Sequence, residues 1–123
     1  MFRDEAYHNL ADVIYKGFLC VGVNLAGKSF VFKTVNDKEF DLIRLYSGSP
    51  EDPNNTLRFN INYLVFSLLV VEGENILRQR EERHIELYDF FANMPADLYT
   101  RIYKELIDLK RTLSELNEYL EGF

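Results

Sequence analysis

The sequence predicts an α+β fold that is mostly helical: an N-terminal helix, one β-hairpin, and three or four helices that end in a long amphipathic helix. Apolar residues recur at helical spacing over most of the chain. Two runs rich in Val and Phe, residues 18–24 and 28–34, flank a short connection that contains glycine, which is typical of a hairpin. The 123 residues suffice for a single domain, 1–123, and are too few for two.

The last stretch, residues 95–121, gives the strongest helical signal. Pro95 suits a first helical turn, where its missing N–H costs nothing. In the first half a second apolar set, Leu98, Tyr103 and Ile107, widens the apolar stripe and predicts burial on two sides. The main seam alternates spacings of three and four for about three heptads and consists of Tyr99, Ile102, Leu106, Leu109, Leu113, Leu116, Leu120 and Phe123.

The second half of this helix allows two interpretations. Its leucines stand among polar residues, so the seam either packs against its own domain or is offered to another protein chain, including a second copy. Under the second interpretation the distal half projects from the domain. The partner-binding residues would then be Leu109, Leu113, Leu116, Tyr119, Leu120 and Phe123.

The first part of the chain predicts a helix and the hairpin. Residues 3–16 place apolar side chains on one face, and Gly17 is a natural stop. In the hairpin, Phe30 and Phe32 point to one side of the second strand. The single cysteine, Cys20, lies among apolar neighbours, and we interpret it as a small core residue in a reducing compartment.

The middle of the chain predicts further helices. Asn36 with Glu39 is close to a capping box, with Thr34 and Asp37 as the alternative register, and the helix should stop near Gly48. The loop that follows is rich in Pro, Gly and Asn.

The apolar run at residues 59–71 begins with strand-like alternation, but its length favours a helix, which we expect. A turn at 72–75 and a helix over 76–92 should follow.

Charge and composition restrict the partners. The net charge of −6 argues against a nucleic-acid partner, since phosphate neutralisation needs a concentrated basic face. The longest apolar run is far shorter than the roughly 20 residues that cross a bilayer. The N-terminus lacks the basic and apolar regions of a signal peptide. We therefore expect a cytoplasmic protein with no membrane partner.

Two Glu-x-x-His pairs are the main candidate for chemistry. Glu5 with His8 and Glu81 with His84 would fit a di-metal carboxylate site, as in some four-helix proteins. Polar stripes on helix surfaces explain both pairs more simply. No glycine-rich nucleotide loop, zinc spacing or nucleophile elbow is present. We therefore expect a non-enzymatic protein without a cofactor, with the di-metal protein as an alternative.

Three segments resemble the small tail-assembly and baseplate-assembly chaperones of tailed bacteriophages. Residues 30–44, FVFKTVNDKEFDLIR, are similar to their strand followed by a capped helix. Residues 63–77 resemble their apolar helix and acidic-glycine turn, and residues 90–103 resemble the stretch in which a proline opens a helix. The resemblance covers roughly residues 30–109 and carries no specific functional residue.

The resemblance implies a protein that binds hydrophobic segments of a tail or baseplate component during assembly, in the cytoplasm of the host cell. A structural subunit of a phage tail, neck or baseplate, located in the virion, is the alternative within the same class. In both cases the partner is another protein chain.

Overall fold

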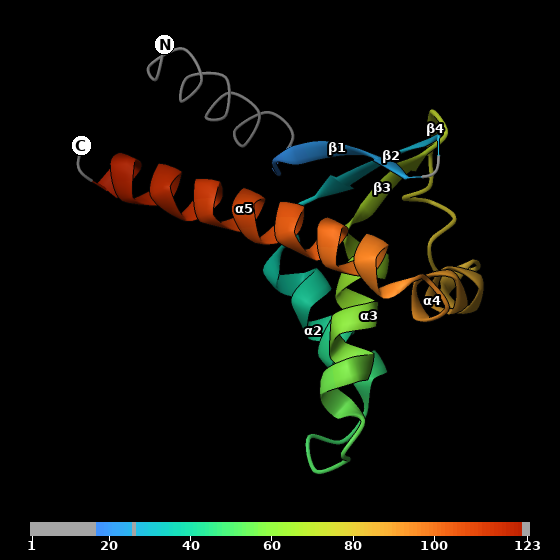
Figure 1. Ribbon diagram of the computed structural model, residues 1–123. Helices are drawn as coiled ribbons and strands as arrows, with labels where there is room; N and C mark the ends of the chain where they lie inside the picture. The colour runs from blue at the N-terminus through green and yellow to red at the C-terminus, as the bar shows by residue number, and fades with distance from the viewer. Residues whose placement is uncertain (1–16, 26, 122–123) are drawn as a thin grey trace.

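The computed structural model describes residues 17–25 and 27–121 (Figure 1). It confirms the mostly helical α+β class, with four helices after the hairpin and a long C-terminal helix. The predicted helix over residues 3–16 lies outside the described residues. The elements in chain order are β1 (Cys20–Leu25), β2 (Lys28–Lys33), α2 (Asp37–Ser47), α3 (Asn55–Ser67), β3 (Leu68–Val71), β4 (Glu74–Asn75), α4 (His84–Ala92) and α5 (Ala96–Glu121).

The prediction of a single hairpin was wrong, because β1 and β2 belong to a four-stranded antiparallel sheet with the order β1-β2-β3-β4. The expected helix over 59–71 ends at Ser67, and the last four residues form β3. Two of those four are valines, which favour a pleated strand. β3 pairs with β2 through Val70 opposite Val31 and Val71 opposite Phe30. The strand therefore forms where a partner strand is available.

The turn predicted at 72–75 is confirmed for its first two residues, whereas Glu74 and Asn75 form β4. Glu72 and Gly73 connect β3 to β4, and both have positive φ angles, 51° and 83°. A type I′ turn requires positive φ at both central residues, which explains the glycine. The predicted start of the next helix at residue 76 was wrong, since turns occupy the chain up to Arg83 and α4 begins at His84.

The inner face of the sheet packs on the helices. Val23, Leu25, Phe30 and Phe32 alternate along β1 and β2 and are buried. The interpretation of Cys20 as a core residue was wrong, because the same alternation places it on the outer face, where it is exposed. The helices, β3 and the residue after β4 contribute the rest of this core, which consists of Ile61, Leu64, Val65, Leu68, Ile76, Leu87, Phe91, Ile102 and Leu106.

Below the sheet, α2 and α3 form a helical hairpin, and α5 crosses this pair (Figure 1). α2 and α3 run side by side, and α5 crosses near the end of this pair that adjoins the sheet (Figure 1). The capping box at the start of α2 is confirmed: Glu39 N donates to Asn36 Oδ1 at 2.8 Å, and Asn36 N donates to Glu39 Oε1 at 3.1 Å. Within the described ranges, no helix has the length and apolar content that a membrane crossing requires.

Candidate functional site

A groove follows α5 where this helix crosses α2 and α3. Its central part has a volume of about 120 Å³. The central part shares Tyr103 and Ile107 with a pocket of about 420 Å³, and it shares Phe40, Tyr63 and Lys110 with a pocket of about 330 Å³. We call the three together the α5 groove. From Tyr99 to Asn117 it follows 19 residues of helix, which span about 27 Å.

The floor of the α5 groove is aromatic. Phe40 packs edge-on against Phe59 and against Tyr63, with ring centroids 5.5 and 6.4 Å apart. Tyr103 is half-buried, and Ile107 is 49 % exposed. These last two residues belong, with Leu98, to the second apolar set of the C-terminal helix. They were predicted to be buried, but the described part of the chain leaves Ile107 open in the groove.

The tyrosines of the groove are fixed and neutral. The Tyr103 hydroxyl donates to Asn60 Oδ1 at 2.9 Å, and the Tyr99 ring stacks on the Tyr103 ring with centroids 5.8 Å apart. Burial raises the pKa of Tyr63, Tyr99 and Tyr103, so all three stay protonated at physiological pH. The groove therefore presents rigid, uncharged rings, which suit apolar partners.

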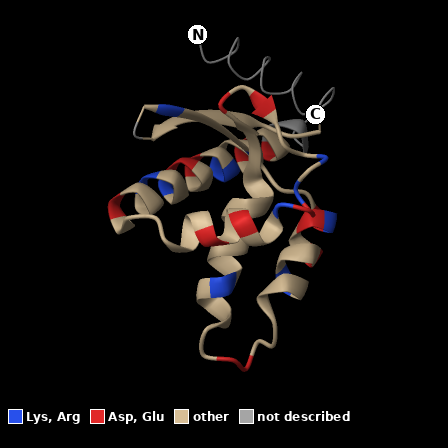
Figure 2. Cartoon of the chain, turned by 90° about the vertical axis from the view of Figure 1, so that its right-hand side faces the viewer, with Lys and Arg blue, Asp and Glu red and all other residues tan. Residues whose placement is uncertain are grey.

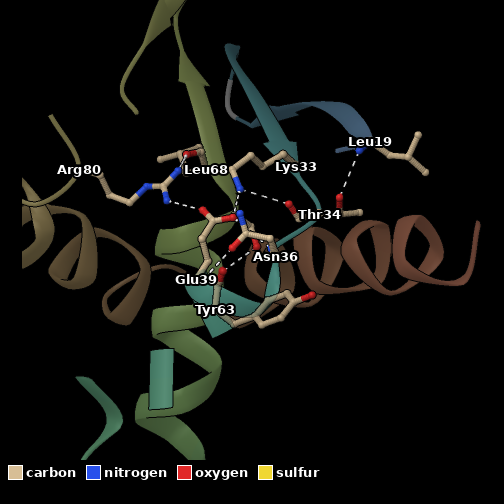
Figure 3. Close-up of polar contacts among 9 residues, drawn as sticks. Leu19, Lys33, Thr34, Asn36, Glu39, Tyr63, Leu68 and Arg80 are labelled. Carbon is tan, nitrogen blue, oxygen red and sulfur yellow. Dashed lines mark hydrogen bonds and ion pairs between the residues drawn. The ribbon is translucent and has the colours of Figure 1, made fainter. Parts of the chain in front are cut away.

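An ion cluster anchors the α2 end of the groove. The carboxylate of Glu39 lies between two buried cations (Figure 3). Lys33 Nζ donates to Glu39 Oε1, and Arg80 Nη1 donates to Glu39 Oε2 at 2.7 Å. Arg80 Nη2 also donates to the Leu68 carbonyl at 3.3 Å. One carboxylate thus ties β2, α2 and the segment before α4 together. The next residue in α2, Phe40, lines the groove floor.

The pKa values in this cluster show that Glu39 stays ionised. Burial is the largest influence and would raise the pKa of Glu39, but hydrogen bonds from Lys33, Arg80 and the Asn36 backbone lower it overall. Burial also lowers the pKa of Lys33, and the hydrogen bond to Glu39 only partly opposes this. The pKa of Lys33 is lowered mainly by this burial, and the positive charge of Arg80 adds a smaller contribution in the same direction. The carboxylate is therefore the charge on which the cluster depends.

The predicted seam residues differ in burial. Leu109 and Leu113 are half-buried, and Leu113 lines the α5 groove. Leu116 is only 5 % exposed, so at this position the seam packs in the way the intramolecular interpretation predicts. The side chains of Tyr119 and Leu120, together with Phe123, lie outside what the structure describes. The most exposed large apolar side chain among the described residues of α5 is therefore Ile107, which lies beside the seam.

The residues of the di-metal alternative are described only in part. Glu5 and His8 lie outside the described residues, Glu81 is exposed and His84 is half-buried. Over residues 17–25 and 27–121, no group of three or more His, Cys, Asp or Glu side chains is placed to hold a metal ion.

His84 instead joins a hydrogen-bond chain. Its Nε2 lies 2.9 Å from Oδ1 of Asn62, and the Asn62 amide nitrogen lies 3.5 Å from Ser47 Oγ. Because the amide nitrogen faces Ser47, the amide oxygen faces His84 and the ring carries its proton on Nε2. The ring stacks on Tyr46 with centroids 4.3 Å apart. This arrangement is that of a packed structural histidine.

Stability should fall as the pH drops because of His84. Burial lowers the pKa of this imidazole, so the unfolded chain binds the proton first. The free energy of unfolding is expected to decrease as the pH falls from about 7.5 through about 6.5 toward the lowered folded-state pKa. Urea unfolding over this range measures the slope. His84→Gln should flatten it, and an unchanged slope in this variant would assign the effect to other groups.

Searches of protein families, curated proteins and solved structures found no significant match for the chain. The function is therefore argued from the α5 groove itself. Sequence reasoning found the helix that forms one wall of this groove but not the groove. The second apolar set on this helix indicated the groove, because a helix with two apolar faces needs a packing partner on each face.

Proposed function

We propose that the chain is a non-enzymatic protein that binds another protein chain through the α5 groove. The observation that carries this proposal is the aromatic floor next to Ile107, which is 49 % exposed on a helix whose neighbouring Leu106 and Ile102 are buried. Exposed apolar patches with polar surroundings are typical of protein-binding surfaces. A few aromatic and aliphatic side chains that fill pockets can supply most of the energy of such a contact.

The particular form we propose is an assembly chaperone of a bacteriophage tail or baseplate, which rests on the resemblance of residues 30–109 to that class. The groove fits this form because an assembly chaperone must hold an apolar segment of its client. A permanent subunit of a tail, neck or baseplate would use the same surface. Retention of the protein in purified particles would distinguish the subunit from the transient chaperone.

A photo-crosslinking amino acid at position 107 tests the proposed function. In cells that naturally produce the protein, this position should give a covalent adduct with a second protein. Position 85 is the matched control, because Ile85 is also a helical isoleucine, is 76 % exposed, and does not line the groove. Equal adducts at both positions, or none at position 107, would refute the groove as the contact surface.

A further inference from the structure

We propose that the occupant of the α5 groove is an amphipathic helix with an acidic flank, contributed by a different protein. This inference rests on the proposed function and specifies the chemistry of the partner. It follows from three observations, namely the helical walls of the groove, its surplus of cations and the poor match of the described distal part of α5 to the groove.

The walls of the groove favour a helical occupant. Except for Thr34 and Val35, the lining residues come from α2, α3 and α5. The backbone groups within a helix are already hydrogen-bonded to each other, so these walls offer few donors or acceptors to an extended strand. A helix brings its own backbone bonds and needs only apolar side chains at positions i, i+3, i+4 and i+7. About 27 Å of groove accommodates about 18 residues of such a helix.

The charges around the groove differ from those of the whole chain. The chain carries 20 acidic and 14 basic residues. Acidic positions also mark the tip of the loop between α2 and α3 (Figure 2). Among the groove-lining residues the balance is reversed, with two carboxylates, Asp37 and Asp108, against four cations. These cations are Arg44, Lys104, Lys110 and Arg111.

Two of these cations are available to a partner. Lys104 and Lys110 are exposed and make no ion pair with any described residue. Arg111 is paired with Asp108 only at 3.7 Å in an exposed position, and such a pair contributes little. Carboxylates on the flank of a docked helix would complement these cations, increase the association rate and fix the orientation.

The described distal part of α5 in a second copy of the chain does not match this helix. The distal part of α5 has the required carboxylates at Glu115 and Glu118. However, the stripe that continues the groove contains Ser114 and Asn117, and the neighbouring Leu116 is buried. Among the described side chains, this part of α5 therefore offers negative charge with a single partly open leucine, Leu113. The occupant that fits both the floor and the rim is a different chain.

Labelled synthetic peptides test the charge of the occupant. The first is an amphipathic helix of about 18 residues with Leu and Phe on one face and Glu on the flanks, and the second has Lys in place of each Glu. Fluorescence anisotropy with the full chain should show about tenfold tighter binding of the acidic peptide, and added salt should reduce the difference. A third peptide with the same composition and scrambled apolar spacing should not bind.

Charge reversal in the protein provides the matched test. The double variant Lys104→Glu with Arg111→Glu should reverse the preference and bind the Lys peptide more tightly, a result that loss of folding cannot produce. Arg101→Glu lies on the same helix, is exposed and does not line the groove, so it should leave the preference unchanged.

The outcomes separate this inference from the proposed function. Equal binding of the two peptides, with loss of both in Ile107→Glu, would overturn the acidic occupant and leave the groove as the contact surface. A dimer in light scattering that Ile107→Glu dissociates would assign the groove to a second copy and also overturn it. Absence of binding by every peptide overturns this inference, and the crosslinking at position 107 then decides the proposed function separately.

Discussion

Glu39→Gln is expected to lower the free energy of unfolding by about 3–5 kcal/mol, because it leaves Lys33 and Arg80 as buried cations without a carboxylate. Glutamine has the same shape and can still accept from the Asn36 backbone, so the capping box is retained and the variant isolates the charge. Urea unfolding monitored by circular dichroism measures the difference. A cost below about 1 kcal/mol would show that the cluster is not a net source of stability.

Two neighbouring variants complete this test. Asn36→Ala removes the cap and leaves the ion cluster, so it should cost only about 1 kcal/mol. Lys33→Met leaves one cation with one carboxylate, and its effect should be much smaller than that of Glu39→Gln, because no buried charge is then left unpaired. If Lys33→Met were as damaging as Glu39→Gln, the second cation would be essential and the proposed charge balance would be wrong.

Leu116→Ala is expected to cost about 2–5 kcal/mol, the range for deletion of a buried leucine side chain. Leu116 is only 5 % exposed, so its removal leaves a cavity instead of a smaller surface residue. Thermal and urea unfolding of the full chain measure this cost.

The matched control for Leu116→Ala is Leu45→Ala in α2. Leu45 is 75 % exposed and should change stability by less than about 0.5 kcal/mol. If both variants behaved alike, the distal half of α5 would not be packed on its own chain, and the original prediction of a partner-binding seam at Leu113 and Leu116 would regain support.

Local sequence signals predicted the elements whose cause is local. The capping box at Asn36 and Glu39 needs only residues three apart, and α5 begins at Ala96, one residue after the predicted start. The turn at Glu72 and Gly73 was likewise predictable, since the glycine adopts a conformation that most residues avoid.

The errors in the fold arose where distant residues decide the structure. The apolar run at residues 59–71 changes from helix to strand after Ser67, and only pairing with β2 determines where it changes. The start of α4 was predicted too early, at residue 76, because a charged residue such as Arg80 is usually found on the exposed face of a helix. In the structure its guanidinium turns inward to Glu39, which is 41 positions away in the chain.

The candidate site was only partly predictable for the same reason. The helical spacing showed that α5 has two apolar faces, but the crossing of α5 over α2 and α3 determines which face is covered. The distal leucines were therefore favoured over Tyr103 and Ile107 as the contact surface. The surplus of cations around the groove was not visible in the sequence either, because its four cations come from two helices and the overall charge is negative.

The direct passage of α3 into β3 has a consequence for detecting a bound partner. Tyr63 in the groove and Val70 in the sheet lie on one uninterrupted backbone segment, since no loop separates Ser67 from Leu68. A contact that steadies this segment at one end should slow deuterium uptake by backbone amides at the other end, seven residues further along the chain. Slower deuterium uptake in the sheet would therefore indicate that the α5 groove is occupied, although no strand residue lines the groove.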